Sequence, residues 1–278
     1  MKKLISLILT IALCLGITAG LTSCNADAAE DWTKIQEKGK FVCGITDYKP
    51  MNYYEDGELV GFDTEFAKAV AAELGVDVEF KVIEWDSKYL ELNKGKIDFI
   101  WNGYTLGNEE DGTSRKEYVD FSYAYLKNVQ VVVTKADKLD ELSTVDAFKG
   151  KSAVAEGGSS GVAVAKKLTG DDKKVSAGFS SQKAALLDLS MGKCDFAVVD
   201  YQIAKTLTGE GNEYDDLAIN PAFTPESEVY AIGCRKGSDF TAKLNEAIEA
   251  LSENGKLAEI AAKYNLQNDL IPNIGKEQ

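Results

Sequence analysis

The stretch Leu92-Asn93-Lys94-Gly95-Lys96-Ile97-Asp98-Phe99 has a close counterpart in the second half of the chain, Leu189-Ser190-Met191-Gly192-Lys193-Cys194-Asp195-Phe196. The copies share Leu, Gly, Lys, Asp and Phe at equivalent positions. Each is typical of a helix that ends at Gly and is followed by a strand beginning at Asp-Phe. Chance recurrence of a common helix-to-strand junction is the alternative. Because one copy lies in each half of the chain, the pair favours two similar lobes.

The residues that follow the two copies predict where a ligand binds. Five positions after each Asp the expected strand ends, at Gly103 in the first half and at Asp200 in the second. In open α/β sheets, ligands bind outside the carboxyl ends of the strands. We therefore expect Gly103 and Asp200 to face each other across a binding site.

Short apolar strands alternate with amphipathic helices from Lys40 onward, which is typical of an α/β protein with mainly parallel sheets. The first helix is expected to have Asp63 or Thr64 as its N-cap and to end at Gly75. Two further apolar helix faces close the chain, over residues 240–251 and 257–264. The candidate strands are 41–45, 76–82, 97–101, 129–133, 152–155 and 196–199.

Two extended segments, 128–133 and 228–233, flank the second half and are interpreted as paired crossovers between the lobes. The predicted organisation is a signal peptide, a lipidated tether, a first lobe, a second lobe and a closing part that completes the first lobe. These units are expected at 1–23, 24–38, 39–127, 128–228 and 229–278.

Composition excludes several classes of function. The 278 residues contain 31 Lys plus Arg against 45 Asp plus Glu, a formal charge of −14, so the chain lacks the basic excess that a nucleic-acid binder needs. There is no His, which removes Ser-His and Cys-His nucleophiles and His-ligated metals. The remaining composition is that of an ordinary globular protein, for which we expect neither metal nor cofactor.

The N-terminus is typical of a secretory signal, with Lys2 and Lys3 preceding an almost wholly apolar segment, 4–21. The following Leu21-Thr22-Ser23-Cys24 resembles the lipobox of bacterial lipoproteins, which implies cleavage before Cys24 and lipid attachment to its sulfur. An uncleaved membrane helix and a chance Cys are the alternatives. Cleavage would remove two lysines and no acid, leaving a formal charge of −16.

Three cysteines remain in the body of the chain, Cys43, Cys194 and Cys234. Their number is odd and their spacing is not that of a metal site. Buried free thiols are the favoured interpretation, because a free Cys behaves as a small apolar residue. One disulfide after export is the alternative.

A series of short motifs, in order and spacing, resembles one protein family over nearly the whole mature chain. The motifs are 44–50, Gly57, Gly61-Phe62-Asp63, Trp85, Gly95-Lys96-Ile97-Asp98, Gly103-Tyr104-Thr105, 115–122, Tyr125, Gly150-Lys151, Gly158-Ser159-Ser160, 195–200 and Arg235-Lys236. They resemble the extracellular solute-binding proteins of family 3, the polar amino-acid receptors of ATP-driven uptake systems. The resemblance implies the periplasmic-binding-protein-like type II fold, with two α/β lobes joined by two crossover strands and a ligand cleft between them.

An α-amino acid carries a carboxylate and an ammonium on one carbon, so its receptor needs a planar cation, backbone amides and acceptors. By the resemblance, Arg115 binds the ligand carboxylate from one lobe and Ser160, at a helix N-terminus, from the other. The Gly103 carbonyl, the Thr105 hydroxyl and the Asp200 carboxylate accept from the ammonium. A solvated Arg115 and simple helix caps at Ser160 and Asp200 are the structural alternatives.

The resemblance also places three residues around the ligand's side chain. Tyr48 and Trp85 are expected as aromatic walls and Asp47 as the polar end of the pocket. Burial in the core or on a lobe surface is the alternative for the two aromatics, and a turn is the alternative for Asp47.

The chain departs from the family at the motif G-x-T-x-T-x-x-R. Gly107 stands where the second Thr is usual, and Arg115 arrives five positions late. Residues 108–112 are therefore interpreted as an acidic insertion, in which Glu109, Glu110 and Asp111 either favour a cationic ligand or face water.

The sequence predicts a monomeric, lipid-anchored receptor on the outer face of the cell membrane, or in the periplasm, that binds a polar or charged α-amino acid. By the resemblance it presents the closed complex to an ABC permease and is no enzyme. A prephenate-type dehydratase on the same fold, with Asp200 or Glu156 as the acid, is one alternative. A surface sensor or interaction protein without a transport role is another.

Overall fold

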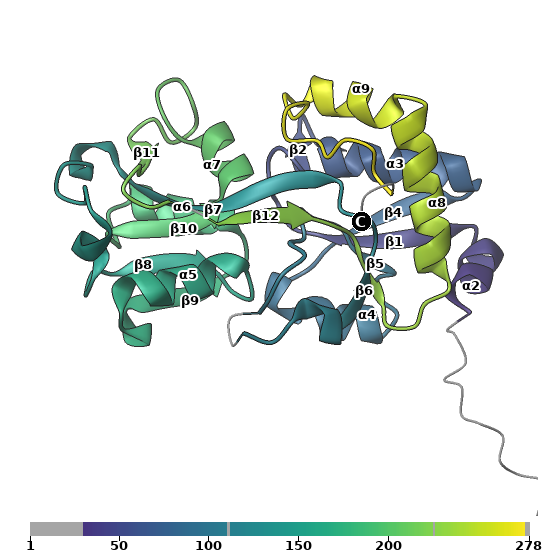
Figure 1. The fold of residues 1–278 in the computed structure, drawn as a ribbon, viewed down its shortest axis with the longest axis horizontal. Coiled ribbons are helices and arrows are strands. Elements are labelled where there is room, and N and C mark those ends of the chain that lie inside the picture. The colour runs from purple at the N-terminus through teal and green to yellow at the C-terminus, as the bar shows by residue number, and fades with distance from the viewer. Residues whose placement is uncertain (1–29, 110–111, 225, 276–278) are drawn as a thin grey trace, which may run out of the picture.

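Two β-sheets divide the molecule into two lobes (Figure 1). The computed structural model describes residues 30–109, 112–224 and 226–275, so Cys24 and the expected signal peptide lie outside the described residues. In this part of the chain, no helix is both long and apolar enough to span a bilayer.

The first lobe is built on a five-stranded sheet. Its strands, in spatial order, are β4 (Asp77–Val82), β1 (Lys40–Ile45), β5 (Phe99–Ile100), β13 (Gly233–Arg235) and β6 (Val119–Phe121). The helices of this lobe are α2 (Asp31–Lys38), α3 (Phe62–Leu74), α4 (Lys88–Asn93), α8 (Phe240–Glu253) and α9 (Lys256–Lys263). A short hairpin of β2 (Tyr53–Glu55) and β3 (Glu58–Val60) precedes α3, and single 3-10 turns lie at η1 (Trp85–Ser87) and η2 (Arg115–Glu117).

The second lobe is built on a six-stranded sheet. Five strands follow the order β11 (Leu217–Ile219), β7 (Leu126–Lys135), β10 (Phe196–Asp200), β8 (Ala153–Glu156) and β9 (Val175–Phe179), and β12 (Ser227–Tyr230) also pairs with β7. Its helices are α5 (Ser160–Thr169), α6 (Gln182–Ser190) and α7 (Tyr201–Leu207). Its 3-10 turns are η3 (Ala136–Lys138), η4 (Val145–Phe148) and η5 (Asp172–Lys174).

Both sheets are mixed, so the expectation of mainly parallel sheets is wrong. In the first sheet, β1 is parallel to β4 and β5, whereas β13 is antiparallel to both of its neighbours. In the second, β7 is antiparallel to β10, β11 and β12. Strand β7 carries the chain into the second lobe, and β13 follows the returning strand β12, so the direction of both is set by the crossing rather than by a β-α-β unit.

The chain crosses between the lobes along β7 and β12, which pair antiparallel from Ser227↔Val129 to Tyr230↔Leu126 (Figure 1). A third segment, not anticipated from the sequence, lies against this crossing. The backbone amide of Lys127 donates to Asp269 at 2.7 Å, and the amide of Ile271 donates to Tyr125 at 2.9 Å. Residues 269–271 therefore pack along the connection between the lobes.

Helix α3 shows where local sequence signals fail. It ends at Gly75, which has the left-handed conformation (φ 70°), as predicted. Its N-cap is Gly61, however, so the expected cap at Asp63 or Thr64 is wrong. Both side chains have other partners, because the Asp63 carboxylate accepts from the Gly103 amide and the Thr64 hydroxyl donates to Asn52.

Aromatic rings and thiols fill the core of the first lobe. Phe41, Phe99, Trp101 and Phe240 pack with ring centroids 5.0 to 6.5 Å apart. Cys43 and Cys234 are free thiols on opposite sides of Phe99, since β5 lies between their strands, and Cys194 is free as well. Two strands that are not neighbours cannot bring Cys43 and Cys234 within bonding range, so free thiols are the correct interpretation.

Candidate functional site

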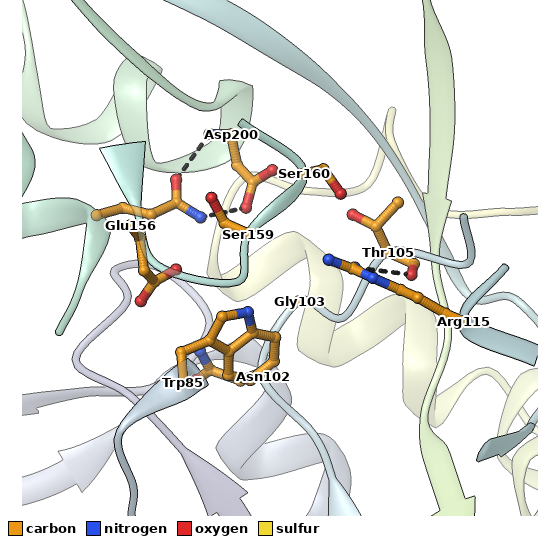
Figure 2. Close-up of a pocket in the computed structure, with 10 residues that line it drawn as sticks. Trp85, Asn102, Gly103, Thr105, Arg115, Glu156, Ser159, Ser160 and Asp200 are labelled. Carbon is orange, nitrogen blue, oxygen red and sulfur yellow. Dashed lines mark hydrogen bonds between the residues drawn. The ribbon is translucent and has the colours of Figure 1, made fainter. Parts of the chain in front are cut away.

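A small polar cavity lies between the lobes, beyond the ends of β5, β8 and β10 (Figure 2). Six of the predicted site residues line it, and four other polar or small residues complete its wall. The predicted residues are Trp85, Gly103, Thr105, Arg115, Ser160 and Asp200. The others are Asn102, Glu156, Ser159 and Gln182.

Arg115 is a buried cation of the first lobe, only 1% exposed. Its Nη1 donates to the Thr105 carbonyl at 3.1 Å and its Nη2 to the Gly158 carbonyl of the second lobe at 3.2 Å. Its Nε donates to Glu109 at 3.2 Å, and the guanidinium lies 4.9 Å from the centre of the Tyr104 ring. A guanidinium has five N–H groups, so two remain for a ligand carboxylate. A solvated surface position for Arg115 is ruled out.

Glu109, the first acid of the predicted insertion, points inward rather than to water. Besides Arg115, its carboxylate contacts Lys88 Nζ at 3.6 Å and accepts a short hydrogen bond from the Tyr89 hydroxyl. Asn108 forms an isolated antiparallel bridge to Ser114. Glu109 is thus the counterion of two buried cations. Glu110 and Asp111, which share the acidic-loop prediction, lie outside the described residues.

Lys88 is a second buried cation at the cleft, and its role was not anticipated from the sequence. Its Nζ donates to the Gly158 carbonyl at 3.0 Å, which links α4 of the first lobe to the loop after β8 of the second. Burial lowers the pKa of Lys88 to about 8, with the Glu109 charge opposing the change. The lysine therefore contributes a direct contact between the lobes.

The second lobe contributes the start of helix α5. Ser159 is the N-cap and Ser160 the first helical residue, and the Ser159 side chain makes no capping hydrogen bond. The first amides of a helix lack intrahelical partners and favour an anion. Gly161 allows the helix to sit tightly on the sheet, since a Cβ there would lie 2.7 Å from the Val198 carbonyl oxygen of β10.

Asp200 ends β10 and is held by amide side chains instead of cations. Asn128 donates to its Oδ1 at 2.8 Å, Gln182 donates to its Oδ2 at 2.5 Å, and Gln130 makes a shorter bond to Oδ1. Burial raises its pKa, and these hydrogen bonds oppose the change. Asp200 occupies the N-cap position of α7, but its side chain makes no capping bond, so the alternative role as a simple helix cap does not apply.

Glu228, on the crossover strand β12, shares two of these donors. Its Oε1 accepts from Asn128 at 2.5 Å and from Gln130 at 2.8 Å, and also from the Thr105 hydroxyl of the first lobe at 3.2 Å. Burial, followed by the Asp200 charge, raises the pKa of Glu228 to about 7. Asp200 and Glu228 therefore lie together where both lobes meet the crossover, and no lysine or arginine of the described residues pairs with either carboxylate.

Gly103 follows β5 with φ +58°, and a Cβ there would lie 2.7 Å from the Tyr48 ring and 3.1 Å from the Tyr230 ring. Only glycine fits this crowded left-handed position. The Gly103 amide donates to Asp63 at 2.7 Å, and Asp63 is a fully buried carboxylate whose pKa burial raises to about 7. This bond fixes the orientation of the peptide at the edge of the cavity.

Two predicted residues do not line the cavity. Tyr48 is 2% exposed and packs beneath Gly103, with its hydroxyl 2.6 Å from that of Tyr230 on the crossover. It belongs to the core rather than to an aromatic wall, because its ring packs against the backbone of Gly103. Asp47 is exposed on a separate surface hollow with Lys49 and Lys183. Tyr48 is therefore not an aromatic wall of this cavity, and Asp47 is not its polar end.

Two of the lining residues that were not predicted, Glu156 and Asn102, have recognisable signals in the sequence, whereas Gln182 has none. Glu156 ends β8 as Asp200 ends β10, so the rule on carboxyl ends of strands applied to it equally. Asn102 adjoins Gly103, and its side chain donates to Thr46 at 2.7 Å. Gln182 is the first residue of α6, and nothing in the sequence marks its amide as a partner of Asp200.

The family of bacterial extracellular solute-binding proteins, family 3, matches residues 41–267. The chain belongs to this family, as its motifs predicted, and the two-lobe fold is confirmed. The L-cystine-binding protein TcyA of Bacillus subtilis is 30% identical, over 95% of this chain and 97% of that protein. The arginine-binding extracellular protein ArtP of the same species is 28% identical, over 93% and 96%. A substrate-binding protein of an ABC uptake transporter from Streptococcus pneumoniae, solved with bound histidine, superposes with a TM-score of 0.74 at 32% identity, covering 85% of this chain and 96% of that one.

Proposed function

We propose that the protein is the substrate-binding component of an ABC uptake system for a polar or charged α-amino acid. The observation that carries the proposal is one cavity between the lobes that brings together Arg115, the N-terminus of α5 and Asp200. A cation and helix amides at one side, and a carboxylate at the other, match the two charges of a free α-amino acid. Amino-acid ligands in the names of the relatives support the same class.

In this proposal the ligand carboxylate binds the two remaining N–H groups of Arg115 and the Ser160 amide and hydroxyl. The ligand ammonium donates to the Gly103 carbonyl, the Thr105 hydroxyl and the Asp200 carboxylate. Trp85 covers one side of the ligand. Because these groups come from both lobes, the ligand stabilises the closed arrangement by contacts that an open one lacks. It is bound without chemical conversion and passed to the permease.

The proposal divides the chain into a first lobe, 39–127 with 229–278, and a second lobe, 128–228, which move about the paired strands β7 and β12. The protein functions outside the cytoplasm as a monomer, and lipid on Cys24 holds it at the membrane. Substitution Cys24→Ala should release the protein from the membrane fraction. If Cys24→Ala stayed in the membrane fraction and the parent carried no lipid label, the lipid anchor would be contradicted. The proposed binding function would be unaffected.

The test of the function is ligand-dependent stability. Full-length protein, purified in detergent and stripped of ligand by unfolding and refolding, is heated with each common amino acid, cystine and prephenate. A ligand at 100 times its Kd should add about 2.7 kcal/mol to the free energy of unfolding. A shift with an amino acid supports the proposal. A shift with prephenate alone, or with none, contradicts it.

Arg115→Ala tests the carboxylate site. The variant should lose about 2 to 5 kcal/mol of binding free energy, since it leaves a charged end of a desolvated ligand unpaired. Lys116→Ala is the control, because Lys116 is the exposed neighbour on the same turn. Titration calorimetry gives both affinities. Equal affinity of Arg115→Ala and the parent would rule out this role for Arg115.

A further inference from the structure

Glu156 is a buried carboxylate of the cavity to which the proposed binding mode assigns no role. It is 3% exposed, it ends β8, and its side chain lines the cavity. Its Oε1 has no hydrogen-bond partner. Figure 2 places Glu156 and Arg115 at opposite sides of the cavity. An unpaired polar atom in such a position is costly unless a ligand group reaches it.

The buried charges of the cleft are not balanced within the protein. The two cations, Lys88 and Arg115, both contact Glu109. That leaves one positive charge in surplus at this side, which a single ligand carboxylate offsets. Across the cavity, no lysine or arginine of the described residues forms an ion pair with Glu156, Asp200 or Glu228, although the charges of Lys88 and Arg115 act on Glu156 from a distance. The surplus there is negative.

The ammonium of an α-amino acid with a neutral side chain offsets only part of that negative charge. In the proposed mode it meets Asp200, whose charge is further dispersed over the amides of Asn128, Gln130 and Gln182. Glu156 lacks such a set of donors for its Oε1. A neutral ligand side chain would leave this carboxylate desolvated and unpaired, which costs far more than leaving it hydrated.

We propose that Glu156 binds a second cationic group, on the ligand's side chain, so that the site selects α-amino acids with a positively charged side chain. The inference rests on the proposed function and names its substrate class. Trp85 lies in the same cavity on the first lobe and provides an aromatic face, which favours a cation near its ring. Burial and then the Asp200 charge raise the pKa of Glu156, while Lys88, Gln182 and Arg115 oppose the change. A ligand cation beside the carboxylate would oppose it further and so favour the ionised form.

Two pairs of ligands of matched shape test the charge directly. Arginine is compared with citrulline, and lysine with norleucine, by calorimetry on the stripped full-length protein. The parent should bind the charged member of at least one pair at least about tenfold more tightly, because one buried charge pair is lost with the neutral one. In Glu156→Gln, which keeps the shape and removes the charge, this ratio should fall by about the same factor.

Glu84→Gln is the matched control. It makes the same change at an exposed carboxylate next to Trp85, and it should keep the parent's ratio. Preference of the parent for citrulline, glutamine or cystine over arginine and lysine would overturn the inference while leaving the proposed function intact. An unchanged ratio in Glu156→Gln would also overturn it. If Glu156→Gln does not fold, the parent's ratio of affinities for the charged and neutral ligands tests the inference by itself. Absence of binding to any amino acid would overturn both proposals.

Discussion

At the scale of single residues, the cleft holds Asp200 and Glu228 with amide side chains, whereas its two buried cations pair with Glu109. Asn128 and Gln130 donate to both Asp200 and Glu228, whereas Lys88 and Arg115 contact Glu109. Amide donors stabilise a carboxylate without neutralising it, so its charge stays available to a ligand ammonium. A lysine in place of Gln130 would compete with that ammonium.

This arrangement predicts a pH dependence for the ligand-free protein. Because the pKa of Glu228 is raised to about 7, the folded chain still binds a proton that the unfolded chain releases above the ordinary value of 4.5. The free energy of unfolding therefore falls as pH rises from about 4.5 towards 7. Glu228→Gln removes this loss, so it should be more stable than the parent by on the order of 2 kcal/mol at pH 8.

Urea unfolding of the ligand-free proteins at pH 5 and pH 8 measures this difference. The gain should be small at pH 5, where Glu228 is largely protonated in the folded parent. Glu226→Gln changes an exposed acid just before β12, so it serves as the control and should show no such trend. A gain that is equal at the two pH values would contradict the prediction.

The sequence was informative about site residues that follow strand ends or helix starts, and poor for those fixed by distant contacts. Gly103 and Asp200 could be found because both follow the repeated Asp-Phe strands. The position of Tyr48 depends on Tyr230, which is 182 residues away, so no local pattern marks it. Glu109 could not be placed either, because an acidic insertion has the same composition whether it faces water or buried cations.

At the scale of elements, the position of helix α5 decides whether Ser159 and Ser160 reach the cavity. The helix lies against β10, and at Gly161 a Cβ would lie only 2.7 Å from the Val198 carbonyl oxygen. A side chain at this position would clash with the Val198 carbonyl oxygen of the sheet. Ligand binding and helix packing are therefore linked through one glycine.

Gly161→Ala should push α5 away from β10. We expect a loss of about 1 to 3 kcal/mol in stability from overpacking, together with weaker ligand binding because the Ser160 amide moves. Chemical unfolding and calorimetry measure the two effects. Gly178→Ala is the control in the same lobe, since a Cβ at Gly178 meets nothing within 4 Å. Parental ligand affinity in a destabilised Gly161→Ala would break the link between packing and binding.

Element prediction succeeded where the local signal was complete. Strand β1, strand β10 and the end of α3 at Gly75 lie where the apolar pattern and the glycine placed them. It failed at the start of α3, since a capping residue type is equally suited to a tertiary hydrogen bond. It missed the hairpin β2–β3, although Asp56-Gly57 is a strong turn signal.

At the scale of the whole molecule, the lobes touch through groups that do not require a ligand. Lys88 and Arg115 of the first lobe both donate to the Gly158 carbonyl of the second. The protein thus supplies part of the closed interface itself. A ligand needs to add only the remaining free-energy difference between open and closed states.

Lys88→Met removes one of these contacts while keeping an unbranched apolar stem of similar length. A hydrogen bond to a charged group contributes about 1.5 to 3 kcal/mol, so the Kd for the ligand should rise by about tenfold or more. The radius of gyration of the saturated protein, from small-angle X-ray scattering, should not change. Lys94→Met, at an exposed position, is the control. An unchanged Kd would mean that the contact contributes nothing to closure.

The two-lobe organisation could be predicted because the repeat and the crossovers leave local traces, but the strand directions could not. Which neighbour a strand pairs with, and in which sense, depends on where the chain returns from the other lobe. The packing of residues 269–271 against Tyr125 and Lys127 was not foreseen for the same reason, since it joins segments far apart in the chain.

The place of β13 between β5 and β6 has a consequence for how the protein is made. All five strands in the central path of the second sheet have been synthesised once Ile219 has emerged, whereas the first sheet has a gap until Gly233–Arg235 arrive. The aromatic core forms later still, because Phe41 and Phe99 pack against Phe240 of α8, which is synthesised after β13. The first lobe is thus completed after the second. A nascent chain that ends before α8 therefore leaves Phe41 and Phe99 without their packing partner Phe240.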